Sequence, residues 1–193
     1  MEARQTRYNG VLLFGLVERA CMFLSIREME LRKLLFDESF PPGAVHFLDP
    51  KLSQATPLRA VGSAELMPNT GGEIRLQGHL DVVMQAECDR CLEPASYPIE
   101  TDFDLFYEPA AAGPAGEEVA ISEGETGIDF YEGDGLELEV VLREQILLAL
   151  PMQRICQEDC RGICPTCGQN RNLVTCDCQV KTVDDRWAAL KDL

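Results

Sequence analysis

Cysteine pairs constrain this 193-residue chain more than any other feature of its sequence. Eight of its nine cysteines fall into four close pairs, and the ninth, Cys21, stands alone. Two thiols on a short turn supply only half of a four-coordinate metal site, so two pairs must meet in space to complete one. In chain order, the first to fourth pairs are Cys88 with Cys91, Cys156 with Cys160, Cys164 with Cys167, and Cys176 with Cys178.

The third pair lies in the segment CPTCG, which has the strongest metal-binding pattern of the four. Pro165 shapes a tight turn, backbone amides can face the first sulfur, and Gly168 allows the conformation that follows the second. This is the pattern of a zinc knuckle, which fills two corners of a tetrahedron. All eight paired cysteines are therefore candidate ligands of structural Zn²⁺.

Disulfides and redox chemistry fit the cysteine pattern less well than metal binding does. A disulfide framework is typical of secreted chains, and charged residues interrupt the early apolar run 11–17 that could imitate a signal peptide. A thioredoxin-like role for one pair would need a surrounding βαβ pattern, and neither Cys-x-x-Cys pair has one. Structural zinc is the better interpretation.

Loop length favours one way of combining the four pairs. Short loops close at a lower entropic cost, so the third pair is expected to share one zinc ion with the fourth. The first and second pairs would then share a second ion and pin the C-terminal segment to the core. A rival arrangement with a single ion joins the first pair directly to the third.

The rest of the sequence predicts an α+β fold, in which an antiparallel β-sheet packs with one main helix. Residues 73–89 alternate apolar and polar side chains, which predicts a long half-buried strand with Gly78 as a bulge or bend. Residues 96–109 alternate similarly and are expected to return beside it. Their connection would present the first cysteine pair at a sheet edge. Residues 22–43 and 57–67 are further extended segments.

The main helix is expected to begin at about Glu137, where the apolar spacing becomes helical, and to end before Pro151. A C-terminal cysteine-rich zinc-binding module follows it. The chain divides into three parts, with translation expected to start at Met22 or Met29. They are a dispensable or non-native extension (1–21), an α+β core with a flexible acidic loop at 108–127 (22–151), and the zinc module with a terminal helix (152–193).

The charge balance limits the classes of function. The formal net charge is −16, so the chain lacks the broad basic surface with which proteins grip naked nucleic acid. Residues 117–144 hold ten acids and the single base Arg143, which suits a basic partner such as a ribosomal protein. We find no catalytic constellation, no membrane-spanning stretch and no phosphate-binding loop. The sequence therefore predicts a non-enzymatic protein without a small-molecule substrate.

Five motifs occur in an order that resembles the YceD family, the large ribosomal RNA subunit accumulation proteins. They are CDRCLEP (88–94), LELEVVLREQILLALPMQRIC (136–156), CRGICPTCGQNRN (160–172), CDC (176–178) and DDRWAAL (184–190). The resemblance covers roughly residues 22–193. Two positions depart from the family pattern: Arg171 stands where the family often has leucine, and Asp185 where it usually has proline.

This resemblance implies a cytoplasmic bacterial factor for ribosome biogenesis, needed for accumulation of the large-subunit (23S) ribosomal RNA. Its expected partner is a pre-ribosomal particle or a basic ribosomal protein, with contact to RNA indirect or made by Arg161 and Arg171. Two alternatives remain: a zinc-held thiol redox sensor, in which oxidation ejects the metal, and a zinc-ribbon regulator that binds nucleic acid.

Overall fold

The computed structural model describes residues 22–110 and 128–178. The N-terminal extension, nearly all of the expected acidic loop and the expected terminal helix lie outside these residues. The sheet is built from β2 (Leu34–Phe40), β4 (Leu58–Leu66), β5 (Ile74–Glu87), β6 (Pro94–Pro109) and β7 (Ile128–Tyr131), in that order. The short strand β3 (Ser53–Gln54) also pairs with β5.

The sheet is mixed, whereas the sequence suggested an antiparallel one. Strands β2, β4, β5 and β6 pair antiparallel with their neighbours, but β7 runs parallel to β6. A parallel partner requires a crossover connection of a dozen or more residues, and the segment 110–127 between β6 and β7 is long enough to provide one. The sequence contains no periodic signal that distinguishes this connection from a loop.

The long hairpin of β5 and β6 is confirmed, but the expected bulge at Gly78 is not. Gly78 pairs in unbroken register with Gly62 on one side and Phe103 on the other. A Cβ atom at Gly78 would lie 2.7 Å from both the Phe103 ring and the Val61 carbonyl oxygen. The glycine is therefore needed for space, because an aromatic ring of the next strand packs against its backbone.

The segment 22–43 is not one extended run. It forms β1 (Phe23–Ser25), the single turn α1 (Ile26–Met29) and then β2, and the turn buries the Met29 side chain. Strand β1 is not part of the main sheet. It pairs with β8 (Gly135–Glu137) in a separate two-stranded sheet. The two short strands precede α1 and α2 respectively, so they tie both ends of the described core together.

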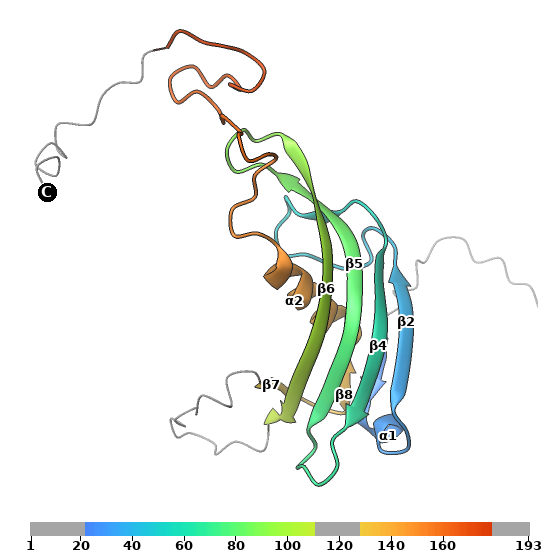
Figure 1. Ribbon diagram of the computed structural model, residues 1–193. Coiled ribbons are helices and arrows are strands. Elements are labelled where there is room, and N and C mark those ends of the chain that lie inside the picture. Colours follow the sequence, from blue (N-terminus) through green and yellow to red (C-terminus); the bar gives the residue numbers. More distant parts are fainter. Residues whose placement is uncertain (1–21, 111–127, 179–193) are drawn as a thin grey trace, which may run out of the picture.

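Helix α2 (Leu138–Ala149) lies across one face of the sheet (Figure 1) and begins one residue after the expected position. Its buried side chains, Leu138, Val141, Leu142 and Ile146, join the inward-facing residues of β2, β4, β5 and β6 in one apolar cluster. Pro151 follows the helix, and the chain continues beyond the hairpin end of β5 and β6. Within the described ranges, no helix combines the length and hydrophobicity needed to cross a bilayer.

Candidate metal centres and an acidic hollow

The turn between β5 and β6 meets the chain that leaves α2, and the first two cysteine pairs come together there. Cys88 and Cys91 lie in the turn, while Cys156 and Cys160 follow the helix. The four sulfur atoms all lie within 4.8 Å of one another. All of these cysteines except Cys156 are buried, so the group is built into the end of the sheet. We call it the first site.

The third and fourth pairs form a second group, here called the second site, with the same 4.8 Å limit between sulfur atoms. Cys164 is buried, Cys167 is exposed, and the two cysteines of the fourth pair are half-buried. These are the two groups that the favoured two-ion arrangement predicts. The rival arrangement, which joins the first pair to the third, is not formed in the described part of the chain.

Sulfur separations at the first site match a tetrahedral metal centre. Cys88 Sγ lies 3.9 Å from Cys160 Sγ, and Cys91 Sγ lies 3.7 Å from Cys156 Sγ. A zinc–sulfur bond of about 2.3 Å places the corners of a tetrahedron about 3.8 Å apart. A disulfide needs a sulfur separation of about 2.05 Å, and all eight cysteines are free. Four thiols at this spacing therefore fit Zn²⁺ in geometry and in donor chemistry.

The first and third pairs form turns of the same design. The Leu92 amide donates to the Cys88 carbonyl oxygen at 2.9 Å, and the Gly168 amide donates to the Cys164 carbonyl oxygen at 2.8 Å. Leu92 and Gly168 both have positive φ angles, 63° and 74°. Leucine rarely adopts this conformation, so the turn of the first pair has the backbone shape of a knuckle without the usual glycine.

Backbone amides favour the thiolate of the first cysteine in each knuckle. In both turns, the amides of the second cysteine and of the residue before it donate to that sulfur. At Cys88, burial favours the neutral thiol, but these amides and that of Cys156, at 3.3 Å, outweigh it and lower the pKa to about 6. At Cys164 the amides likewise lower the pKa to about 6. Thiolate is the form that binds zinc.

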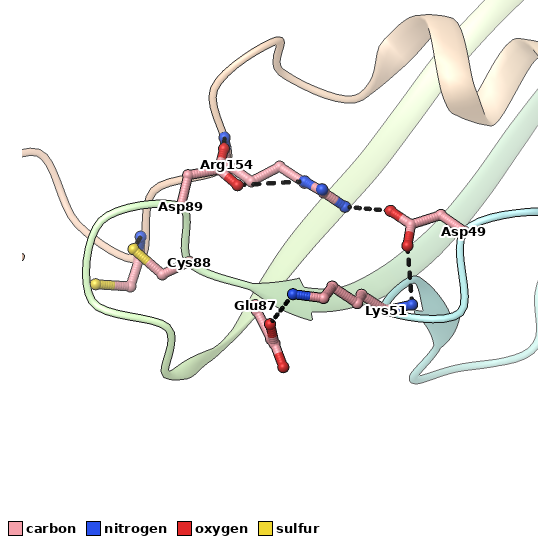
Figure 2. A network of polar contacts seen from close by, with 7 residues as sticks. Asp49, Lys51, Glu87, Cys88, Asp89 and Arg154 are labelled. Carbon is pink, nitrogen blue, oxygen red and sulfur yellow. Dashed lines mark hydrogen bonds and ion pairs between the residues drawn. The ribbon is translucent and has the colours of Figure 1, made fainter.

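An ion-pair network joins the first site to the loop between β2 and β3 (Figure 2). The Asp89 backbone amide donates to the Arg154 carbonyl oxygen at 2.7 Å, and the Arg154 backbone amide donates to Asp89 Oδ2 at 2.7 Å. The Arg154 guanidinium lies 3.0 Å from Asp49 Oδ2 and 3.9 Å from Asp89 Oδ1. Beside it, Lys51 Nζ lies 2.7 Å from Glu87 Oε2. Arg154 thus holds the chain after α2 against the loop between β2 and β3.

Asn172 is a functional candidate that the sequence reasoning missed. Its Nδ2 lies 3.3 Å from Cys160 Sγ, and its Oδ1 accepts a 2.7 Å hydrogen bond from the Arg161 amide. A donor to a ligating sulfur orients the ligand and stabilises its charge. The only signal in the sequence was the Asn-Arg-Asn segment after the knuckle, which resembles the Asn-Leu-Asn of the family but does not reveal which group it contacts.

The two arginines named as RNA-contact candidates lie on the surface of the cysteine module. Arg161 and Arg171 are exposed, and neither forms an ion pair with another described residue. The described part of the module, residues 152–178, holds three arginines and three acidic residues, so its net charge is zero. These arginines can contact phosphate only as isolated charges.

A hollow of about 300 Å³ lies between β7, β8 and the first turns of α2. Aromatic side chains line it, and two of them, Phe23 and Phe130, are 48% and 60% exposed. No basic residue lines it, and its carboxylates form no ion pair with a described residue. The lining carboxylates belong to Asp129, Glu132, Glu137 and Glu144.

Comparison with known proteins gives one family. A family model described as "Large ribosomal RNA subunit accumulation protein YceD" matches residues 76–193, from β5 through all four cysteine pairs. The chain is 29% identical over 136 residues to large ribosomal RNA subunit accumulation protein YCED homolog 1, chloroplastic, of Zea mays, covering 58% of this chain and 46% of that one.

Two bacterial relatives extend the comparison. The chain is 24% identical over 170 residues to YlbN of Bacillus subtilis, covering 87% of this chain and 92% of that one. It is 30% identical over 115 residues to a protein of Mycobacterium tuberculosis, covering 55% of this chain and 49% of that one. The chain thus spans about half the length of the maize and mycobacterial relatives. No solved structure matches it.

Proposed function

Because the chain belongs to the YceD family, we propose that it supports accumulation of the large ribosomal RNA subunit by binding a pre-ribosomal particle through a basic ribosomal protein. It would act as a cytoplasmic biogenesis factor, and its two zinc ions would be structural. The acidic hollow between β7, β8 and α2 carries the proposal of a protein partner. It combines exposed aromatic rings with carboxylates that form no ion pair with any described residue, a surface complementary to a lysine- or arginine-rich segment with apolar side chains.

The distribution of charge supports a protein partner rather than naked RNA. The described residues 128–144 hold six acids and one base, a balance of −5, whereas residues 152–178 are neutral. Binding to naked RNA requires several phosphate contacts, and the overall charge of −16 opposes them. A particle that already carries basic proteins would instead be attracted to the hollow.

Zinc has a scaffolding role in this proposal. The first site joins the β5–β6 turn to the chain after α2, and the second site closes the module beyond it. All eight ligands are cysteines, which leaves no open coordination position of the kind that catalytic zinc uses. Elemental analysis should find two zinc ions per chain. A single ion would contradict the two-site partition, and none after non-oxidising purification would contradict zinc binding.

Deletion of the gene tests the cellular function. The expected result is a lower ratio of large-subunit to small-subunit ribosomal RNA, and fewer large particles in a sedimentation profile. The wild-type protein should co-sediment with precursors of the large subunit. Unchanged ribosomal RNA ratios and particle profiles in the deletion strain would overturn the proposal.

Charge-neutralising variants test the binding surface. Replacing the four carboxylates of the hollow by their amides should reduce co-sedimentation with pre-ribosomal particles more than Arg161→Ala or Arg171→Ala does. A matched control carries the same charge change on the open face of the sheet, at Asp37, Asp81, Glu100 and Asp102. Equal losses in the control, or tight salt-sensitive binding to naked RNA that the arginine variants abolish, would show that the hollow is not the binding surface.

A further inference from the structure

The second site is carried by a small hairpin that packs on the first site. Ile163 and Asn170 form an antiparallel bridge, the Cys164 amide donates to the Gln169 carbonyl oxygen at 2.8 Å, and the Arg171 amide donates to the Gly162 carbonyl oxygen at 2.9 Å. The third cysteine pair sits at the tip of this hairpin. Its base, after Cys160, is therefore fixed by ordinary strand hydrogen bonds.

The hairpin base contacts the knuckle of the first site directly. The Ile163 amide donates to the Arg90 carbonyl oxygen at 2.9 Å, and Arg90 lies between the two cysteines of the first pair. Gly162 has a φ angle of 66°, and a Cβ atom there would lie 2.8 Å from the same carbonyl oxygen. Asn170 Nδ2 adds a contact at 3.3 Å to Glu93 Oε1, just after the knuckle. The two sites thus share one backbone interface.

A single side chain connects this interface to a ligand of the first site. Asn172 Nδ2 lies 3.3 Å from Cys160 Sγ. Asn172 Oδ1 accepts a hydrogen bond from the Arg161 backbone amide, and the Asn172 backbone amide donates to Asn170 Oδ1 at 2.9 Å. In sequence, Asn172 belongs to the other site, because it lies between the third and fourth cysteine pairs. A donor to one site is therefore positioned by the loop that the other site closes.

We propose that the two sites bind zinc cooperatively and that the carboxamide of Asn172 couples them. This inference rests on the proposal that both groups hold zinc. Closure of the loop between Cys167 and Cys176 restricts Asn172 to the position from which it donates to Cys160 Sγ. The first site then binds zinc more tightly, and linkage requires the second site to gain by the same factor. Contacts of this kind change metal affinity by roughly 10- to 100-fold, and we expect a coupling factor of about 10.

A thermodynamic cycle on the full chain measures the coupling. Chelator competition gives the overall constant for two zinc ions in the wild type. Two half-site variants give the single-site constants: Cys176→Ser with Cys178→Ser retains the first site, and Cys91→Ser with Cys156→Ser retains the second. The overall constant divided by the product of the single-site constants is the coupling factor. It should be about 10 in the wild type and about 1 when Asn172→Ala is added throughout.

A second measurement keeps all eight cysteines and so does not depend on the folding of the half-site variants. At one equivalent of zinc, native mass spectrometry separates chains with no, one and two ions. The quantity to compare is a quotient: the squared population of the one-ion species divided by the product of the zero-ion and two-ion populations. Asn172→Ala should increase this quotient relative to the wild type. Leu173→Ala, in the same loop but with its side chain 76% exposed, is the matched control and should leave this quotient unchanged.

The possible outcomes separate the coupling from the zinc proposal on which it rests. A wild-type chain that binds fewer than two ions in excess zinc would overturn the two-site proposal itself. Two bound ions with a coupling factor near 1, or a quotient that Asn172→Ala leaves unchanged, would overturn the coupling alone. An equal change in Leu173→Ala would also overturn it, because the effect would then belong to the loop and not to the carboxamide.

Discussion

The sheet core and the cysteine module (residues 152–178) differ in what holds them together. The core buries a continuous cluster of apolar side chains that runs from Leu24 in β1 to Ile146 in α2. The module contributes Cys160 to a small separate cluster, with Ile155 packed against it. Apolar burial on that scale cannot offset the entropy of ordering the segment. The core is therefore expected to fold by burial, and the module by metal binding and hydrogen bonds.

The two regions also differ in how they tolerate irregular backbone. In the sheet, Gly78 is required because a ring of the neighbouring strand occupies the space of its side chain. In the knuckles, the residue after the second cysteine has a positive φ angle and donates its amide to the carbonyl oxygen of the first cysteine, and even Leu92 adopts this conformation. Steric fit thus governs the core, whereas the direction of polar groups governs the module. Four predictions test this difference, from the largest expected effect to the smallest.

Removal of zinc by a strong chelator should have the largest effect, and it should be confined to the module. Apparent binding energies of structural zinc are on the order of 10 kcal/mol per site, so residues 152–178 should lose their order while the sheet persists. Hydrogen exchange followed by mass spectrometry should show fast exchange in the module and continued protection in β5. Equal loss of protection in both regions would contradict the distinction between them.

Leu80→Ala should destabilise the core by about 2–5 kcal/mol, because it leaves a cavity around a side chain that is fully buried in the central strand β5. Urea unfolding followed by circular dichroism gives the change in free energy of unfolding. The zinc content of the folded variant should stay at the wild-type value. A variant that remains folded but loses zinc would show that the first site depends on core packing.

Leu92→Gly should stabilise the first site by about 1 kcal/mol, since glycine adopts positive φ without the steric cost that leucine has. Little packing is lost, because the leucine side chain is 54% exposed. The matched change is Gly168→Ala in the second knuckle, where the space is open but φ is 74°, so it should weaken the second site. Competition with a zinc chelator measures the change in zinc affinity that each variant causes. Effects of the same sign would refute the shared design of the two knuckles.

Arg154→Met should have the smallest effect, a loss of under about 1 kcal/mol, because its ion pairs are partly exposed. The expected change is a faster release of zinc from the first site at low ionic strength, and 1 M salt should reduce the difference from the wild type. The control is Arg59→Met. Arg59 forms its ion pair with Asp37 of the sheet, at a distance of 3.4 Å. A loss that salt does not change would indicate packing and not charge.

Much of the site was predictable because its determinants are local. The spacing of the cysteines and the short loops between them predicted both groups of four, which the structure brings together. The alternation in residues 73–89 and the apolar spacing after Glu137 predicted β5 and α2. The contact of Asn172 with Cys160 could not be predicted, because it depends on how one hairpin packs on another.

By itself, the sequence determined those features that depend on neighbouring residues: the half-buried strands, the amphipathic helix, the knuckle turns and the excess of negative charge. Tertiary structure decided the parallel pairing of β7, the role of Gly78 and the ion pair that brings Arg154 to Asp49. It also gathered carboxylates and aromatic rings from β7, β8 and α2 around one hollow. The physical reason is that periodicity and turn entropy act over a few residues, whereas strand pairing, steric fit and charge proximity depend on residues far apart in the chain.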